Sequence, residues 1–137
     1  MVTSQDDIKV EILATVDVEA FTVQLRSDGI VHSHTQADIE FDVESLKKFT
    51  VEMGKLTHGK KAPLLLTLDD FAIPPVDTRE YWALKDSCPY ASAEAFITSS
   101  IGHKLIGNFY LKLNKPGRPT RLFTNKNEAI KWLRTFL

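Results

Sequence analysis

Two histidines are spaced so that they could serve as metal ligands. His32 and His34 are two residues apart in an extended segment, which places both imidazoles on one face of a strand. That pair is half of a metal site, and nothing at ligand spacing surrounds His58 or His103. We therefore expect no metal site and two solvent-facing imidazoles.

Two adjacent carboxylates could do acid–base chemistry. Asp69 and Asp70 directly follow the apolar run 62–68, where open α/β sheets place their ligand crevices. Like charges held close together raise one pKa of a carboxylate pair. However, neighbouring side chains on an extended chain point apart, and the sequence offers no second catalytic residue type to complete a set. We therefore expect no catalytic residues and no enzymatic activity.

Thr78 is a candidate switch residue. Asp77 and Glu80 have the spacing of a capping box, which predicts that a helix begins at Asp77, after Pro74 and Pro75. Thr78 would then lie in the first turn, where free amides and the helix dipole favour an added phosphate.

The composition narrows the class of protein. The chain has 137 residues, of which 43% are hydrophobic and 26% charged, and its net charge is -1. These values predict one globular domain without the basic field of a nucleic-acid binder. A single cysteine, no signal-peptide pattern and no long apolar run predict a cytoplasmic protein without a transmembrane segment or a cofactor. We expect residues 1–7 to be disordered and residues 8–137 to form the domain.

The elements that must position these residues follow from the periodicity of apolar side chains. Alternation predicts strands at 8–12 and 20–25, and Asp28-Gly29 predicts a hairpin turn. The later elements are a helix from Asp42 to about Gly59, a central strand at 62–68, a helix after 77, a strand at 91–98, a helix capped by Ser99 or Ser100, a strand at 120–123 and a last helix opened by Thr124 or Asn125. This order predicts an α/β fold in which an antiparallel N-terminal hairpin joins parallel strands in one mixed sheet, packed with about four helices.

The C-terminal third of the chain resembles a bacterial family of small proteins grouped with SpoIIAA-like and STAS domains. The resemblance is carried by residues 106–116, 119–124 and 128–133, together with the hairpin 28–30 and the strand 63–66, and it covers about residues 18–137. It implies the same mixed sheet with helices. It also implies a non-enzymatic, regulatory protein-interaction module.

In STAS domains of the anti-sigma-factor-antagonist type, an Asp ends the central strand, and eight residues later an Asp-Ser-Ser/Thr-Gly motif opens a helix. Asp69 and Asp77 match the two aspartates, and Thr78 falls at the phosphorylated position. Arg79 and Glu80 depart from the motif. The interaction and switch surface that we expect consists of Asp69, Asp70, Asp77, Thr78 and Arg79, because this end of the sheet gathers loops and a helix N-terminus on a rigid scaffold.

Three functions make different predictions. An interaction module, with an unidentified protein or a second copy of the chain as partner, predicts an exposed apolar patch near Tyr81 and Trp82 and no deep cavity. A binder of small molecules or lipids, like the related CRAL-TRIO domains, predicts an apolar cavity of ~300 Å³ or more. An enzyme predicts that Asp69, Asp70 and a histidine converge on one point. We expect the first.

Overall fold

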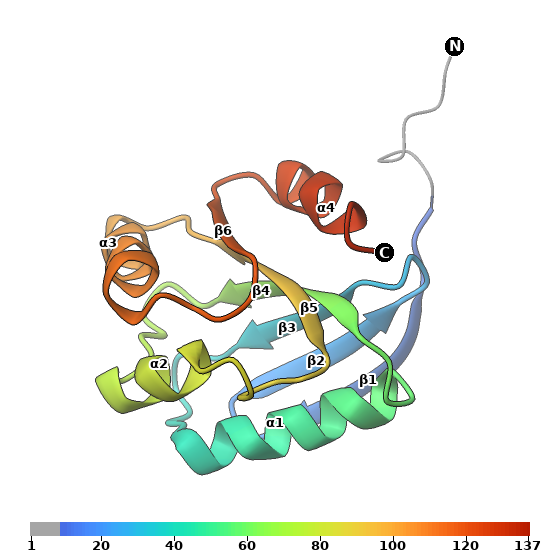
Figure 1. The fold of residues 1–137 in the computed structure, drawn as a ribbon, viewed down its shortest axis with the longest axis horizontal. Coiled ribbons are helices and arrows are strands. Elements are labelled where there is room, and N and C mark those ends of the chain that lie inside the picture. The colour runs from blue at the N-terminus through green and yellow to red at the C-terminus, as the bar shows by residue number, and fades with distance from the viewer. Residues whose placement is uncertain (1–8) are drawn as a thin grey trace.

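The computed structural model describes residues 9–137, which form a six-stranded mixed sheet with helices on both faces (Figure 1). In chain order the elements are β1 (Ile12–Val18), β2 (Phe21–Arg26), β3 (Val31–Thr35), α1 (Val43–Leu56), β4 (Ala62–Leu68), α2 (Val76–Ala83), β5 (Ala91–Ile97), α3 (Ile101–Phe109), a π-helical turn (Tyr110–Asn114), β6 (Thr120–Phe123) and α4 (Lys126–Arg134). The predicted α/β class is confirmed. The segment 1–7, predicted to be disordered, lies outside the described residues.

The strands lie in the sheet in the same order as in the chain. The pairs β1–β2 and β2–β3 are antiparallel, whereas β3–β4, β4–β5 and β5–β6 are parallel. Right-handed crossovers that always step in one direction place their helices on one face of the sheet. Accordingly α1, α2 and α3 share one face, and α4, which follows the last strand, covers the other (Figure 1).

The turn between β2 and β3 forms at the predicted Asp28-Gly29. Gly29 has a φ of 89°, which a residue without a side chain adopts at no steric cost. The Arg26 guanidinium donates to both carboxylate oxygens of Asp28, at 3.0 and 2.7 Å. Local chemistry therefore fixes this hairpin.

The first strand differs from its prediction. Alternation predicts a strand at 8–12, but β1 begins at Ile12, and residues 9–11 lie outside it. Val18 pairs with Phe21 across a two-residue turn in which Glu19 has a φ of 52°. This turn sets the register of an edge strand that has a single neighbour, and the alternation at 8–12 therefore lies beyond the paired segment.

Three helices begin with the side-chain caps that their sequences predict. Asp42 accepts a hydrogen bond from the Ser45 amide, and Ser100 and Asn125 cap α3 and α4 in the same way. The predicted capping box of α2 is wrong: this helix begins at Val76, after Pro75, with no side-chain cap. Pro75 lacks an amide and has a fixed φ, and it takes the N-cap position two residues before Asp77, which the capping spacing indicates.

Candidate functional site

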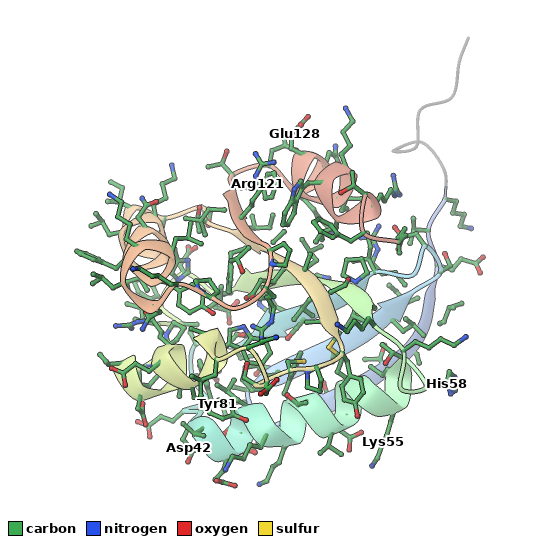
Figure 2. All side chains as sticks on the ribbon, in the orientation of Figure 1. Asp42, Lys55, His58, Tyr81, Arg121 and Glu128 are labelled. Carbon is green, nitrogen blue, oxygen red and sulfur yellow. The ribbon has the colours of Figure 1, made fainter. Side chains whose placement is uncertain are left out.

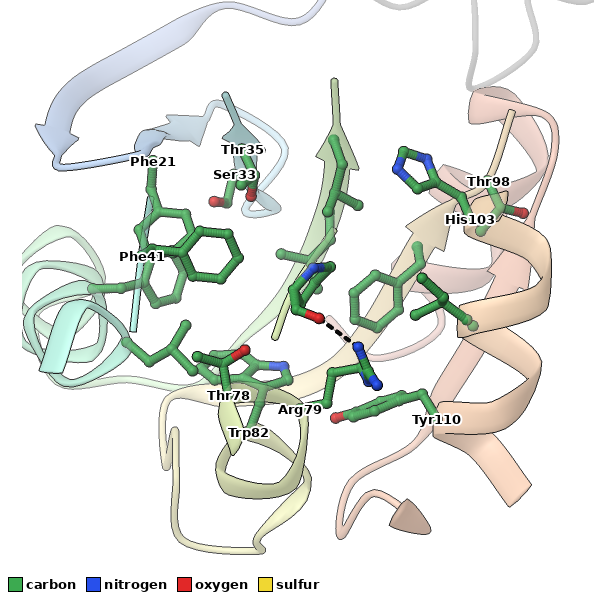
Figure 3. Close-up of a pocket in the computed structure, with 18 of the residues that line it drawn as sticks. Phe21, Ser33, Thr35, Phe41, Thr78, Arg79, Trp82, Thr98, His103 and Tyr110 are labelled. Atoms are coloured by element: carbon green, nitrogen blue, oxygen red, sulfur yellow. Dashed lines mark hydrogen bonds between the residues drawn. The ribbon is translucent and has the colours of Figure 1, made fainter. Parts of the chain in front are cut away.

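An apolar cavity of about 110 Å³ lies between the sheet and the three helices that share one face. Its floor comes from β3, β4 and β5, and its walls come from α1, α2, α3 and the π-helical turn. Figure 3 shows His103 and Tyr110 reaching in from the α3 side, Ser33 and Thr35 on β3, and Thr78, Arg79 and Trp82 on α2. Residues from Phe21 to Leu122 therefore meet around one space.

Aromatic rings build much of the wall. Phe21 meets Phe41 edge to face at 5.1 Å between ring centroids, and Phe49 meets Trp82 in the same way at 5.7 Å. Phe96 meets Tyr110 at 5.9 Å across the other end of the cavity. Rigid rings in edge-to-face pairs cannot bend to fill an irregular space, and the cavity is what they leave between them.

Three residues of the wall carry buried polar atoms without a hydrogen-bond partner among the described residues. These atoms are Ser33 Oγ, His103 Nδ1 and Tyr110 Oη. The His103 Nε2 atom lies 3.0 Å from the Ala72 carbonyl oxygen, which only accepts, so Nε2 carries the proton and Nδ1 of the neutral ring is an acceptor. Burial raises the pKa of Tyr110, and the Glu94 carboxylate adds to that rise, so the phenol stays a donor. Unpaired buried groups are costly, so each of these three atoms lacks a hydrogen bond that would stabilise it.

A buried ion pair lies next to the cavity wall and contacts Trp82, one of the residues that line it. The Glu94 carboxylate accepts from Arg118 at 2.8 Å and from the Trp82 indole at 2.9 Å. Arg118 also donates to Ser87 Oγ at 2.6 Å and lies 4.9 Å from the centroid of Trp82. Burial raises the pKa of Glu94, and Arg118 opposes that rise. This network is not among the features predicted from the sequence; its signals there are a charged residue inside an apolar strand and an arginine close to two prolines.

The five predicted surface residues do not form one exposed surface. The Thr78 side chain is buried, lines the cavity, and donates to the Pro75 carbonyl at 2.7 Å. Arg79 is half-buried on the same wall, and its guanidinium donates to the Pro74 carbonyl. Asp70 and Asp77 are exposed. The structure therefore brings Thr78 and Arg79 to the cavity rather than to a docking surface.

Asp69 instead joins the two histidines on the opposite face of the sheet. Its carboxylate lies 2.8 Å from His34 Nε2, and Thr67 Oγ1 lies 2.8 Å from both His34 Nδ1 and His32 Nε2. The bond from His34 lowers the pKa of Asp69. Thr67, His34 and Asp69 thus form a hydrogen-bonded series of a hydroxyl, a base and a carboxylate that orients the base. However, Asp70 is not part of this series, and the sheet lies between the series and the cavity. Residues 9–137 contain no group of three or more side chains placed to hold a metal ion.

Comparison with known proteins places the chain in a family. Residues 23–137 match the model of a family described as "Domain of unknown function (DUF7793)". The chain belongs to this family. The matched range contains every residue of the cavity wall except Phe21. No curated protein matches the chain. A crystal structure of a protein with unknown function from Arthrobacter sp. FB24 is similar at 24% identity, over 81% of this chain and 96% of that one, with a TM-score of 0.28. A TM-score of this size carries no argument about fold or function.

Exposed apolar side chains lie along α3 and in the segment from Phe71 to the start of α2, rather than at Tyr81 and Trp82. Trp82 is buried, and Tyr81 is half-buried on the α1 side, where Lys47 Nζ lies 6.0 Å from its ring centroid (Figure 2). What we call the α3 surface consists of Ile101, Leu105, Phe109 and Leu113, which recur every four residues, and of Phe71, Ile73 and Val76. The hydrogen bond from His103 Nε2 to the Ala72 carbonyl joins α3 to the segment that carries Phe71 and Ile73. No helix among residues 9–137 is long and apolar enough to cross a membrane.

Proposed function

We propose that this protein is a non-enzymatic binding domain that takes a small, mostly apolar molecule into the cavity beneath α1, α2 and α3. One observation carries the proposal: an apolar cavity has a wall in which Ser33, His103 and Tyr110 each hold an unpartnered polar atom. Apolar side chains at such a wall favour an apolar body, and the polar atoms favour a ligand that also bears hydrogen-bonding groups.

The size of the cavity limits the ligand. At about 110 Å³ it does not reach the ~300 Å³ or more that we expect of a site for lipids or drug-sized molecules, so the ligand proposed here is smaller than those. An apolar cavity of about 150 Å³ in another protein holds benzene, so this one suits a body of about one six-membered ring. A long lipid chain does not fit inside it.

Titration with toluene, followed by the methyl NMR signals of both faces of the sheet, tests the proposal. We expect the methyl signals of Ile106 and Leu66 to shift, because they line the cavity, and those of Leu133 to stay. Ser33→Ile fills the cavity and should abolish the shifts. Gln24→Ile makes a comparable change on the other face of the sheet and should preserve them. Equal shifts on both faces, or none at the solubility limit of toluene, would contradict the proposal.

We propose self-association as a second function, and the α3 surface supports it. Phe71 is 86% exposed and Leu113 is 72% exposed, and apolar patches of this kind mark interaction sites. Lys104 and Lys112 lie in the same helical segment as the apolar residues of α3, and Asp70 precedes Phe71 in the chain. A second copy related by a two-fold axis could set the lysines of one copy against Asp70 of the other. The regulatory interaction role implied by the STAS resemblance belongs with this second proposal.

Sedimentation equilibrium tests the second proposal. We expect a reversible dimer for the unmodified protein and a monomer for Leu105→Glu. Lys104→Glu should weaken the dimer, and the double variant with Asp70→Lys should restore it in part. Val51→Glu, at an exposed site on α1, is the matched control and should leave the dimer unchanged. An unmodified protein that stays monomeric at every concentration would exclude self-association.

A further inference from the structure

We infer that the ligand of the cavity is an apolar carboxylate, with its apolar body in the cavity and its carboxylate on Arg79. This inference rests on the proposed function, because it names the chemical class of the molecule that the cavity binds. It is carried by the position of the Arg79 guanidinium and by the partners that this guanidinium has and lacks.

Arg79 differs from the other arginines that the fold removes from solvent. Arg26 lies 2.7 Å from a carboxylate oxygen of Asp28, Arg118 lies 2.8 Å from Glu94, and Arg134 lies 3.3 Å from Asp28. Arg79 is half-buried as well, yet none of the carboxylates among residues 9–137 comes within 4.0 Å of it. Its described hydrogen bond goes to the neutral Pro74 carbonyl. A charge that is partly removed from water is stabilised by a counter-charge, and at this site the described residues do not provide one.

The place of Arg79 makes the missing counter-charge a ligand group. Figure 3 shows its side chain extending from α2 toward Tyr110, along the cavity wall. A guanidinium binds a carboxylate with two parallel hydrogen bonds, and it has N–H groups left after its bond to Pro74. Tyr110 faces the same space with a phenol that has no partner among the described residues. A carboxylate between Arg79 and Tyr110 would satisfy both groups.

A ligand with a carboxylate also fits the positions of the cavity and of its positive charge. The cavity holds about one ring, and its wall is apolar apart from the atoms already named. The single cation of that wall lies on α2, at one side of the space rather than at its centre. A ring inside and one charged group at the edge match this layout. A neutral apolar molecule would leave the guanidinium without a counter-charge.

Phenylacetate and phenylacetamide form the matched pair of probes, because they share the ring and linker and differ in charge. Binding is measured by calorimetry and by the methyl signal of Ile106. We expect the unmodified protein to bind phenylacetate at least about tenfold more tightly than phenylacetamide, since a charge-assisted bidentate pair is worth about that factor. Arg79→Gln should remove this preference and leave amide binding within about twofold. Arg79→Lys, which keeps the charge without the fork, should fall between them.

Two further variants separate this inference from the proposed function. Arg121→Gln removes an exposed arginine outside the cavity and should change neither affinity. Equal affinity of the unmodified protein for both probes would overturn the carboxylate inference and leave the proposed function standing. If Ser33→Ile still binds phenylacetate with full affinity, the result would contradict binding in the cavity, and it would leave standing the inference that Arg79 binds the carboxylate. Binding of neither probe would overturn both.

Discussion

Beneath α4, the fully buried side chains are small or aliphatic, and the rings of Phe123, Trp132 and Phe136 pack against them while partly exposed. Three alanines, Ala93, Ala95 and Ala129, let the helix approach the strands, and Leu65 and Leu133 fill the layer between them. Beneath α1, α2 and α3, the corresponding layer is built from aromatic rings packed edge to face, and it contains the cavity.

The difference has a physical origin in how many helices share each face. One helix can settle onto small residues until the contact is complete, as α4 does. Three helices that share a face must also pack against one another, and α2 is only eight residues long and has no side-chain cap. The large rings of Phe49, Trp82 and Phe96 bridge the resulting space without filling it. The α4 face therefore contributes mainly stability, and the α1–α3 face combines stability with room for a ligand.

The largest expected effect comes from the ion pair below the cavity. Arg118→Met leaves the fully buried Glu94 without its partner, and we expect a loss of about 3–5 kcal/mol in the free energy of unfolding. Urea unfolding at neutral pH measures it. The double variant Glu94→Gln/Arg118→Met should recover part of that loss, because no unpaired charge remains. Equal stability of the single and double variants would show that the pair is not what supports this wall.

A matched pair of valine substitutions tests the contrast between the faces directly. Ala95→Val adds two methyl groups to the filled face and should cost about 1–3 kcal/mol. Ser33→Val adds bulk beside the cavity and removes a hydroxyl that has no partner, so it should be neutral or stabilise the fold by about 1 kcal/mol. Thermal unfolding of both variants measures the difference. If Ser33→Val costs as much as Ala95→Val, the two faces are equally well packed.

The fold could be predicted where the signal is local. Asp42 caps α1, Asp28-Gly29 forms its turn, and the apolar run Ala62–Leu68 is β4 within the predicted bounds. In each case a few neighbouring residues determine the structure. The edge strand β1 is the exception, because its register depends on a turn at Glu19 that has a positive φ without a glycine to signal it.

The candidate site could be predicted only in fragments, because its residues are brought together by packing. Thr78 and Arg79 are singled out in the sequence, but as parts of a surface, and the structure places them on the cavity wall. The pairing of Glu94 with Arg118 spans 24 residues, with α3 and the π-helical turn between them. A cavity is a volume that side chains fail to fill, and no spacing of residues along the chain encodes it.

The smallest expected effect lies on the α4 face, where the helix leaves part of the sheet uncovered. Burial lowers the pKa of His32 from 6.5 to about 4, and the charges of Lys126 and Arg26 add to the shift. Between pH 6.5 and about 4, His32 is therefore protonated in the unfolded chain and neutral in the folded chain. The stabilisation that the neutral ring provides is complete above pH 6.5 and is lost as the pH falls toward 4. Because the ring is partly exposed, we expect the free energy of unfolding to fall by about 1 kcal/mol between about pH 7 and about pH 5.

Urea unfolding at both pH values should show that His32→Gln reduces this loss and that His58→Asn, at an exposed position, does not. An unchanged pH dependence in His32→Gln would mean that solvent reaches His32 in the folded protein and that α4 does not bury this part of the face.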